Sequence, residues 1–345
     1  MIVQVGPYPE PIGGVSVYIK RMKQYMDTLN VSNEVWDISG IKKKAAGVVN
    51  IRLRYVPFKL IKDQPDLVHY HIPGTSHKLY VAAFNRMLKL PVKKVITIHG
   101  DSRELFHKGN MISGALNSFD RIICVKAGDG EYLRKKGVAC AIDEIPSFIP
   151  PLITGEVHIP KYILDFINHH SFIIAANASC IQFYRQLDLY GIDMCIQLME
   201  KLIGQEKGAG LIFFLPNVND KDYYNNLRLM AKEMGVSEHI LFVTEKMEIY
   251  PVIGLSHLFI RPTCSDGYGI SVAEAICQKV PAIASDVCER PAGTIIFKSR
   301  DLDELYKKTL DIMENYSSHV EKIRNMKQPD NKKKVLDIYI ECLKG

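Results

Sequence analysis

Residues 257–274 read HLFIRPTCSDGYGISVAE, and this stretch predicts an α/β fold. Its first residues form an apolar run that is typical of a buried strand, a loop with two glycines follows, and a helical pattern starts near Ser271. A strand, a glycine-containing loop and a helix in this order aim backbone N–H groups and a helix N-terminus at one point. The stretch therefore predicts an anion site that suits a group such as phosphate.

The same alternation of apolar runs and helical segments extends along the whole chain and is typical of parallel sheets. In the first half, the expected strands are 2–5, 34–38, 67–71, 94–99 and 121–125, and the expected helices are 15–29, 77–88, 111–117 and 128–136. In the second half, the expected strands are 172–176, 210–215, 240–244, 257–261 and 282–285, and the expected helices are 192–203, 223–233, 271–278 and 302–315.

A proline-rich stretch separates the two series. Residues 145–151 read IPSFIPP, which is too stiff to continue a helix or a strand. A chain of 345 residues is also too long for one ordinary core. We therefore expect Rossmann-like domains at 1–150 and 171–328, a linker with a short helix at 151–170, and a last helix within 329–345 that packs back on the N-terminal domain. Two such halves imply a ligand cleft between them.

Composition excludes several classes of protein. Apolar residues make up 47% of the chain, charged residues 24%, and the eight cysteines form no C-x-x-C pair, as in a globular protein of a reducing compartment. The sequence opens directly on a strand, and no apolar stretch is long enough to span a bilayer. We expect a cytoplasmic protein, in peripheral contact with the inner face of the cell membrane or free of it.

Charge is distributed unevenly along the chain. Residues 1–150 contain 22 Lys and Arg against 13 Asp and Glu, a net charge of +9, and the remainder has a net charge of −3. Basic clusters lie at 42–44, at 52–62 and at 134–136. This excess favours an anionic membrane or a phosphate-bearing acceptor, or it is only a solvated surface. Aromatic residues do not alternate with the cations, so we expect no nucleic-acid partner.

Four motifs occur in a characteristic order: GPYPEPIGGVS at 6–16, VITIHG at 95–100, SDGYGISVAEA at 265–275 and PAIASDVCERP at 281–291. Together they resemble the GT4 family of retaining glycosyltransferases, in the branch associated with bacterial surface polysaccharides. The resemblance covers essentially the whole chain and implies the GT-B fold, with two Rossmann-like domains facing each other across a cleft.

The resemblance also implies a reaction and its partners. A nucleotide diphospho-sugar donor would bind mainly to the C-terminal domain, and a saccharide or lipid-linked saccharide acceptor would approach from the N-terminal one. No metal or other cofactor would be required. The family's E-x7-E pair matches Asp266 and Glu274, and its strand-end histidine matches His99. The expected donor-binding residues are Gly13, Gly14, Gly267, Tyr268, Gly269, Ile270, Ser271 and Glu274, and the expected catalytic residues are His99, Asp266 and Arg185.

The sequence departs from the family at two positions. Asp266 stands where a glutamate is usual, and Tyr190 stands where relatives carry a lysine for the diphosphate. Arg185 is the cation of residues 177–191 and is therefore the diphosphate candidate. Either another cation substitutes for the lysine, or the protein is slow or inactive. A sugar-nucleotide epimerase of the same fold and a degenerate binding protein are the alternatives.

Several motifs have simpler explanations. Ser271 and Glu274 match a helix capping box, and His99 alone would suit a satisfied strand-end histidine. The D-x-D sequences at 220–222 and 301–303 fall at expected helix starts, where acidic residues are favoured, so no metal site is expected there. His69 and His71 face one side of a strand, but no third metal ligand is near in sequence.

Overall fold

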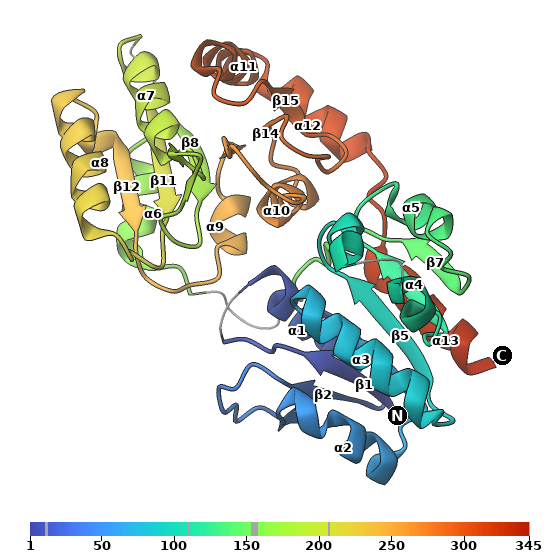
Figure 1. Ribbon diagram of the computed structural model, residues 1–345. Coiled ribbons are helices and arrows are strands. Elements are labelled where there is room, and N and C mark those ends of the chain that lie inside the picture. Colours follow the sequence, from blue (N-terminus) through green and yellow to red (C-terminus); the bar gives the residue numbers. More distant parts are fainter. Residues whose placement is uncertain (11–12, 109–110, 153–157, 206–207, 345) are drawn as a thin grey trace. The chain divides into compact units, whose positions relative to one another are not determined.

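The computed structural model describes residues 1–10, 13–108, 111–152, 158–205 and 208–344. The chain forms two compact units: unit 1 comprises Met1–Leu152 and Pro329–Gly345, and unit 2 comprises Ile153–Gln328. Each unit is a parallel β-sheet with helices on both faces (Figure 1). The predicted α/β class with two Rossmann-like domains is confirmed.

Unit 1 contains a seven-stranded sheet in the order β3-β2-β1-β4-β5-β6-β7. Its strands are β1 (Ile2–Gly6), β2 (Asn33–Asp37), β3 (Val48–Asn50), β4 (Leu67–Tyr70), β5 (Lys93–Ile98), β6 (Arg121–Cys124) and β7 (Ala141–Glu144). Its helices are α1 (Gly14–Thr28), α2 (Val56–Asp63), α3 (Thr75–Leu88), α4 (Met111–Leu116), α5 (Asp129–Lys135) and α13 (Asn331–Lys344), with 3₁₀ helices at Leu53–Tyr55 and Ser102–Lys108.

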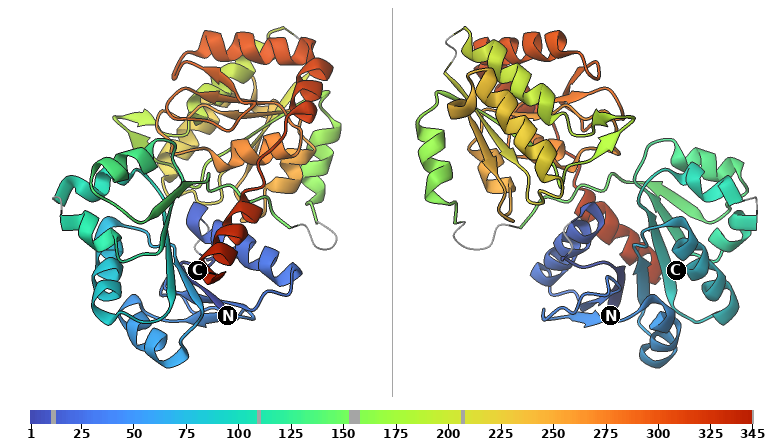
Figure 2. Two further views of the ribbon diagram at one scale, coloured as in Figure 1. Left: turned by 90° about the vertical axis from the view of Figure 1, so that its right-hand side faces the viewer. Right: turned by 60° about the vertical axis from the view of Figure 1, so that its left-hand side comes forward.

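Two groups of helices cover the sheet of unit 1. Helices α2, α3, α4 and α5 pack on one face, and α1 and α13 pack together on the other (Figure 2). The C-terminal helix α13 therefore belongs to the core of unit 1, where Val335, Ile338 and Tyr339 are buried against β4 and its neighbours.

Unit 2 contains a six-stranded sheet in the order β12-β11-β8-β13-β14-β15 and a separate two-stranded hairpin, β9-β10. The strands are β8 (Phe172–Asn177), β9 (Phe183–Tyr184), β10 (Leu187–Asp188), β11 (Ala209–Phe214), β12 (Ile240–Val243), β13 (Leu258–Arg261), β14 (Ala282–Ser285) and β15 (Ile295–Phe297). The helices are α6 (Lys161–Asn168), α7 (Ile192–Ile203), α8 (Lys221–Glu233), α9 (Tyr250–Gly254), α10 (Ile270–Cys277), α11 (Leu302–Glu314) and α12 (Tyr316–Asn325), with a 3₁₀ helix at Ser237–His239.

The core of unit 2 also lies on both faces of its sheet. Helices α7, α8 and α11 cover one face, and α6, α9, α10 and α12 cover the other. The short helix expected within the linker 151–170 is α6, and it packs on the sheet of unit 2, because Ile163 is buried with Ile173 and Phe214. Residues 153–157 lie outside the described residues.

The sequence did not predict the helices α2, α9 and α12, nor several short strands at the edges of the sheets. Strands β3, β7 and β15 have three or four residues and are only partly buried. An edge strand lacks the continuous apolar run of a central parallel strand, so the hydrophobic pattern does not predict it.

Both sheets have a position where the direction of the strand order reverses. It lies between β1 and β4 in unit 1 and between β8 and β13 in unit 2. In open α/β sheets, ligands bind beyond the carboxyl ends of the strands at this position. The fold thus places one candidate site in each unit.

Candidate functional site

Asn177 and Arg261 end the two strands on either side of the reversal in unit 2, β8 and β13. Nη1 of Arg261 donates to the backbone oxygen and to the side-chain oxygen of Asn177, each at 3.2 Å. These bonds hold a guanidinium at the carboxyl edge of the sheet, where a ligand is expected.

Asp266 lies between two guanidiniums. Its Oδ2 accepts from Nε of Arg261 at 2.9 Å and from Nη1 of Arg290 at 2.8 Å, and its Oδ1 accepts from the backbone N–H of Gly267 at 2.9 Å. Burial opposes ionisation, but the two arginines outweigh it and lower the pKa of Asp266 to about 2. The carboxylate is therefore ionised and fully used in orienting the loop and both arginines.

Arg290 supports this loop through hydrogen bonds to three of its neighbours. Its side chain is only 1% exposed. Nε donates to the backbone oxygen of Ser285, and Nη2 donates to Oγ1 of Thr263 and Oγ of Ser285. Gly269 has a φ of +85°, and a Cβ there would lie 2.9 Å from Nη1 of Arg290. Only glycine fits this position, both for its backbone conformation and for its contact with the guanidinium.

Arg261 keeps one nitrogen for a ligand. Among the described residues, no group hydrogen-bonds to its Nη2. Its guanidinium carbon lies 5.2 Å from the ring centroid of Tyr190, the residue that stands where relatives have a lysine. A cation contributed by β13 thus lies next to the side chain that replaces the lysine.

The glycine loop leads directly into the N-terminus of α10. The helix begins at Ile270, with Gly269 as its N-cap and without a side-chain cap. Gly267 is exposed, and Tyr268, Ile270 and Ser271 are partly exposed. The predicted donor-binding loop and the N-terminal end of the helix are therefore accessible.

The capping-box explanation of Glu274 is wrong. Ser271 is the second residue of α10 and not its N-cap, so Glu274 does not occupy the third helical position that a capping box requires. Glu274 is 4% exposed. Glu274 is the fifth of the eight residues of α10, so helix capping does not account for its buried position.

Arg185 lies apart from this network. It has a φ of +49° at the exposed turn of the hairpin β9-β10, and its guanidinium contacts the ring of its neighbour Tyr184 at 5.2 Å. The described hydrogen bonds and ion pairs do not connect it to Asp266. The role predicted for Arg185 stays a prediction; the sequence did not draw attention to Arg261 and Arg290, although an arginine that ends an apolar strand is a usable signal.

In unit 1, His99 follows β5 and belongs to a buried cluster of rings. Its Nε2 is 3.1 Å from Nδ1 of His71, and the ring of Tyr18 from α1 packs edge-on against it at 5.4 Å. Burial and the charge of Lys78 lower the pKa of His99 to about 3. His99 is thus a neutral imidazole at physiological pH and is not a proton donor through an imidazolium.

Further contacts of the cluster reach the C-terminal helix. Nδ1 of His69 is 2.5 Å from Oη of Tyr339, and its Nε2 is 2.7 Å from Oγ1 of Thr97. His71 is fully buried and its Nε2 has no partner among the described residues. A buried acceptor without a partner costs less than a buried N–H without one. We therefore infer that Nδ1 of His71 donates to His99, whose own proton then lies on Nδ1.

Gly13 and Gly14 form the start of α1. Gly13 is the N-cap, and both glycines are exposed. Among the described residues, no atom beyond its chain neighbours lies within 4 Å of the position that a Cβ of Gly13 would take. Oγ of Ser16 donates to the backbone oxygen of Gly13 and accepts from its N–H. Because Tyr18 of the same helix contacts His99, α1 and His99 belong to one region at the carboxyl edge of the sheet.

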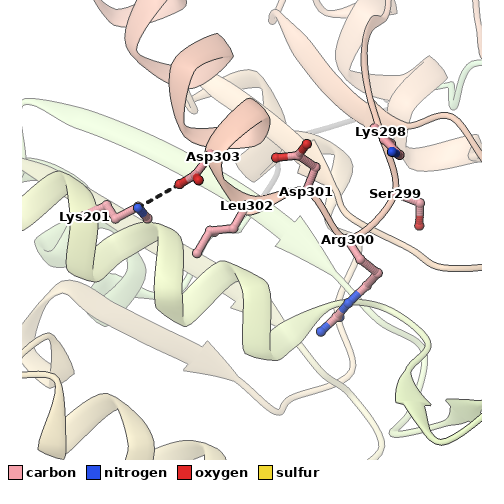
Figure 3. Close-up of a pocket in the computed structure, with 7 residues that line it drawn as sticks. All are labelled: Lys201, Lys298, Ser299, Arg300, Asp301, Leu302 and Asp303. Carbon is pink, nitrogen blue, oxygen red and sulfur yellow. Dashed lines mark hydrogen bonds and ion pairs between the residues drawn. The ribbon is translucent and has the colours of Figure 1, made fainter.

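The two D-x-D sequences have structural roles. Asp220 and Asp301 cap α8 and α11 by accepting from backbone N–H groups. Asp303 pairs with Lys201 at 2.9 Å beside a surface hollow of about 500 Å³ (Figure 3). Among the described residues, no group of three or more His, Cys, Asp or Glu side chains is arranged to hold a metal ion.

Known structures share this fold. A glycosyltransferase from Rickettsia africae ESF-5 matches with a TM-score of 0.72 and 14% identity, over 100% of this chain and 98% of that one. The lipopolysaccharide outer core galactosyltransferase WaaB matches with a TM-score of 0.67 and 11% identity, over 99% of both chains. HepE from Anabaena, in complex with UDP, matches with a TM-score of 0.63 and 12% identity, over 97% and 94%.

The two Rossmann-like units of this chain therefore have the GT-B fold of these structures. The family Glycosyltransferase Family 4 matches residues 12–151, and the family Glycosyl transferases group 1 matches residues 174–328. The chain therefore belongs to the GT4-type glycosyltransferases. No curated protein sequence matches it.

Proposed function

We propose that this protein transfers a sugar from a nucleotide diphospho-sugar to an acceptor hydroxyl with retention of configuration. The observation that carries the donor assignment is Arg261, which is held by Asp266 and Asn177 and keeps Nη2 for a ligand beside the start of α10. The presence of UDP in the similar HepE structure supports a nucleotide donor. By resemblance, the product is a capsule, exopolysaccharide or O-antigen glycan.

In this proposal the chemistry is electrostatic. The guanidinium of Arg261 and the first N–H groups of α10 stabilise the departing diphosphate, which accumulates negative charge as the glycosidic bond breaks. Arg261 takes the role that we first assigned to Arg185. Asp266 is a positioning residue that holds Arg261. The guanidinium and the helix terminus together supply the positive charge that a metal ion supplies elsewhere, so we propose a metal-independent reaction.

The remaining predicted residues have supporting roles in the proposal. The buried carboxylate of Glu274 accepts from ribose hydroxyls of the donor, and the backbone of the glycine loop contacts its sugar. In unit 1, the neutral ring of His99 donates a hydrogen bond through Nδ1 to a substrate oxygen, and the exposed N-terminus of α1 at Gly13 and Gly14 contributes to donor binding.

Calorimetry of the full chain with UDP, GDP and ADP tests the donor site. Loss of a hydrogen bond to a charged group costs about 1.5–3 kcal/mol, so Arg261→Met should weaken binding of the preferred diphosphate roughly 10- to 100-fold. The affinity for the corresponding nucleoside monophosphate should fall by a smaller factor in this variant. The matched control is Arg185→Met, which should bind normally. Equal losses in the two variants, or no binding of any nucleotide to the wild-type protein, would refute the assignment.

Unit 1 also carries a candidate membrane surface on α2. Phe58 is 69% exposed and Ile61 is 45% exposed, and the exposed cations Arg54 and Lys62 lie on the same short segment. We propose that this segment inserts its apolar side chains at an anionic lipid surface. None of the helices in the described part of the chain combines the length and the apolar character needed to cross a bilayer.

Sedimentation with vesicles tests the membrane proposal. Vesicles with phosphatidylglycerol should bind the protein in low salt and release it in high salt, whereas phosphatidylcholine vesicles should not bind it. Phe58→Ser should reduce binding, and Met87→Ser, at the similarly exposed end of α3, should not. Equal binding of both variants would exclude α2 as the contact.

A further inference from the structure

Lys78 is a buried lysine without a partner. It is 7% exposed, and no hydrogen bond or ion pair of its ammonium is found among the described residues. Lysine is almost never this buried unless it is paired, because desolvation of an unpaired ammonium is costly. Its ammonium is not among the fully buried unpaired polar atoms, so the stem is covered while the tip reaches solvent. The cation is therefore accessible to a small ligand.

Lys78 lies in the first turn of α3, which begins at Thr75. The N-cap is Gly74, with a φ of +80°, so no side chain caps the helix, and the first turn contains no acidic residue. The first N–H groups of a helix lack intrahelical partners, and the positive end of the dipole disfavours a lysine at this position. The helix terminus and the ammonium therefore both contribute positive charge to this region, and no carboxylate of the described residues forms an ion pair with Lys78.

This positive region lies beside the candidate catalytic histidine. Helix α3 follows β4, His99 follows the adjacent strand β5, and the charge of Lys78 acts on the His99 ring. Glu104 is the acidic group that acts on Lys78, but the two do not approach within ion-pair distance. The Cα–Cβ bonds of a helix tilt toward its N-terminus, so the side chain of Lys78 leaves the helix in the direction of the uncapped end.

We propose that Lys78 and the N-terminus of α3 bind a phosphate group of the acceptor. The anion site stands on the geometry of unit 1 alone, and its assignment to the acceptor rests on the proposed function. A phosphate at this position would receive N–H bonds from the helix and one charged bond from the lysine. The phosphate comes either from a soluble sugar phosphate or from the diphosphate of a lipid-linked acceptor.

Acetylation of the lysines of the full chain in the absence of nucleotide tests the proposed phosphate site at Lys78. Peptide mass spectrometry measures the extent of acetylation at each lysine. Burial lowers the pKa of Lys78, so its amine should react readily. A bound anion that raises this pKa by one unit slows the reaction about tenfold. Millimolar pyrophosphate should therefore protect Lys78 and leave Lys62, an exposed lysine of α2, unaffected. Protection should persist in Arg261→Met, so this result is independent of the donor site.

Two further arms identify the source of the phosphate. Glucose 6-phosphate represents a soluble acceptor. Phosphatidylcholine vesicles that contain polyprenyl diphosphate represent a lipid-linked acceptor, and the same vesicles without polyprenyl diphosphate are the control. Protection by either supports the site and names the source. An unreactive Lys78, or one whose reaction is unchanged by pyrophosphate and by both acceptors, would overturn the proposal.

The variant Lys78→Met separates ligand binding from a structural role. An unpaired ammonium that serves a ligand contributes little to folding, so the melting temperature without ligand should be unchanged or higher. A clear drop, with Lys62→Met as the control, would show that the lysine serves the fold and would also overturn the proposal.

Discussion

Replacing Asp266 with asparagine removes the anion between two arginines. A folded pKa of about 2, against the ordinary value of 3.8, corresponds to about 2.5 kcal/mol of stability at neutral pH. Removing one partner of a buried ion pair costs about 3–5 kcal/mol, because the remaining charges lose their compensation. For a domain of this size, each 1 kcal/mol lowers the melting temperature by about 2–4 °C. Asp266→Asn should therefore melt about 5–20 °C below the wild type at pH 7.

The stability difference between wild type and Asp266→Asn should also depend on pH. Because folding lowers the pKa of Asp266, its contribution is complete above the unfolded value of 3.8 and is lost as the pH falls toward about 2. The difference between wild type and variant should therefore shrink between pH 4 and pH 2. Asp303→Asn, which breaks an exposed pair with Lys201 in the same unit, should melt almost normally.

Scanning calorimetry measures both melting temperatures. Fluorescence of Trp36, which is the single tryptophan and is buried in unit 1, reports the unfolding of unit 1. A calorimetric transition that the fluorescence does not follow is therefore that of unit 2. If Asp266→Asn melts within about 2 °C of the wild type at pH 7, or if the gap is the same at pH 2.5, the network does not stabilise unit 2 as argued here.

Three further predictions concern the two units separately. Gly269→Ala should cost about 1–3 kcal/mol, because of its φ and its contact with a buried guanidinium, whereas Gly267→Ala should cost little; thermal melts compare them. Burial lowers the pKa values of His69, His71 and His99, so the unfolded chain binds more protons below pH 6.5, and the melting transition reported by Trp36 should shift to lower temperature as the pH falls from 6.5 to 5. Tyr339→Phe removes the partner of His69 and should cost about 1–3 kcal/mol in the same transition, and an unchanged midpoint would contradict this.

The central strands and main helices were predictable from the sequence because their burial leaves a direct hydrophobic pattern. Strands such as β8 and β11 are buried on both faces and appear as continuous apolar runs. The glycine loop was predictable as well, since the requirement for glycine at position 269 arises from backbone conformation and close contact. These are local properties of the chain.

The arginine pair was not predictable in the same way. Arg261 and Arg290 are 29 positions apart, and their shared carboxylate brings them together only after β13 and β14 pair. The sequence alone pointed to Arg185, because that residue is the nearest cation to the missing lysine along the chain. Proximity in sequence is not proximity in space for residues that follow different strands.

The sequence by itself determined the fold class, the position of the anion-binding loop and the GT4 resemblance, because each rests on residue types at short, regular spacings. The tertiary structure decided which arginines bind the carboxylate of the loop, that Glu274 is not part of a capping box, and that Lys78 is buried near His99 with no ion-pair partner among the described residues. These properties depend on strand order, exact helix boundaries and burial. They arise only when distant segments pack, since charge and solvation are set by neighbours in space.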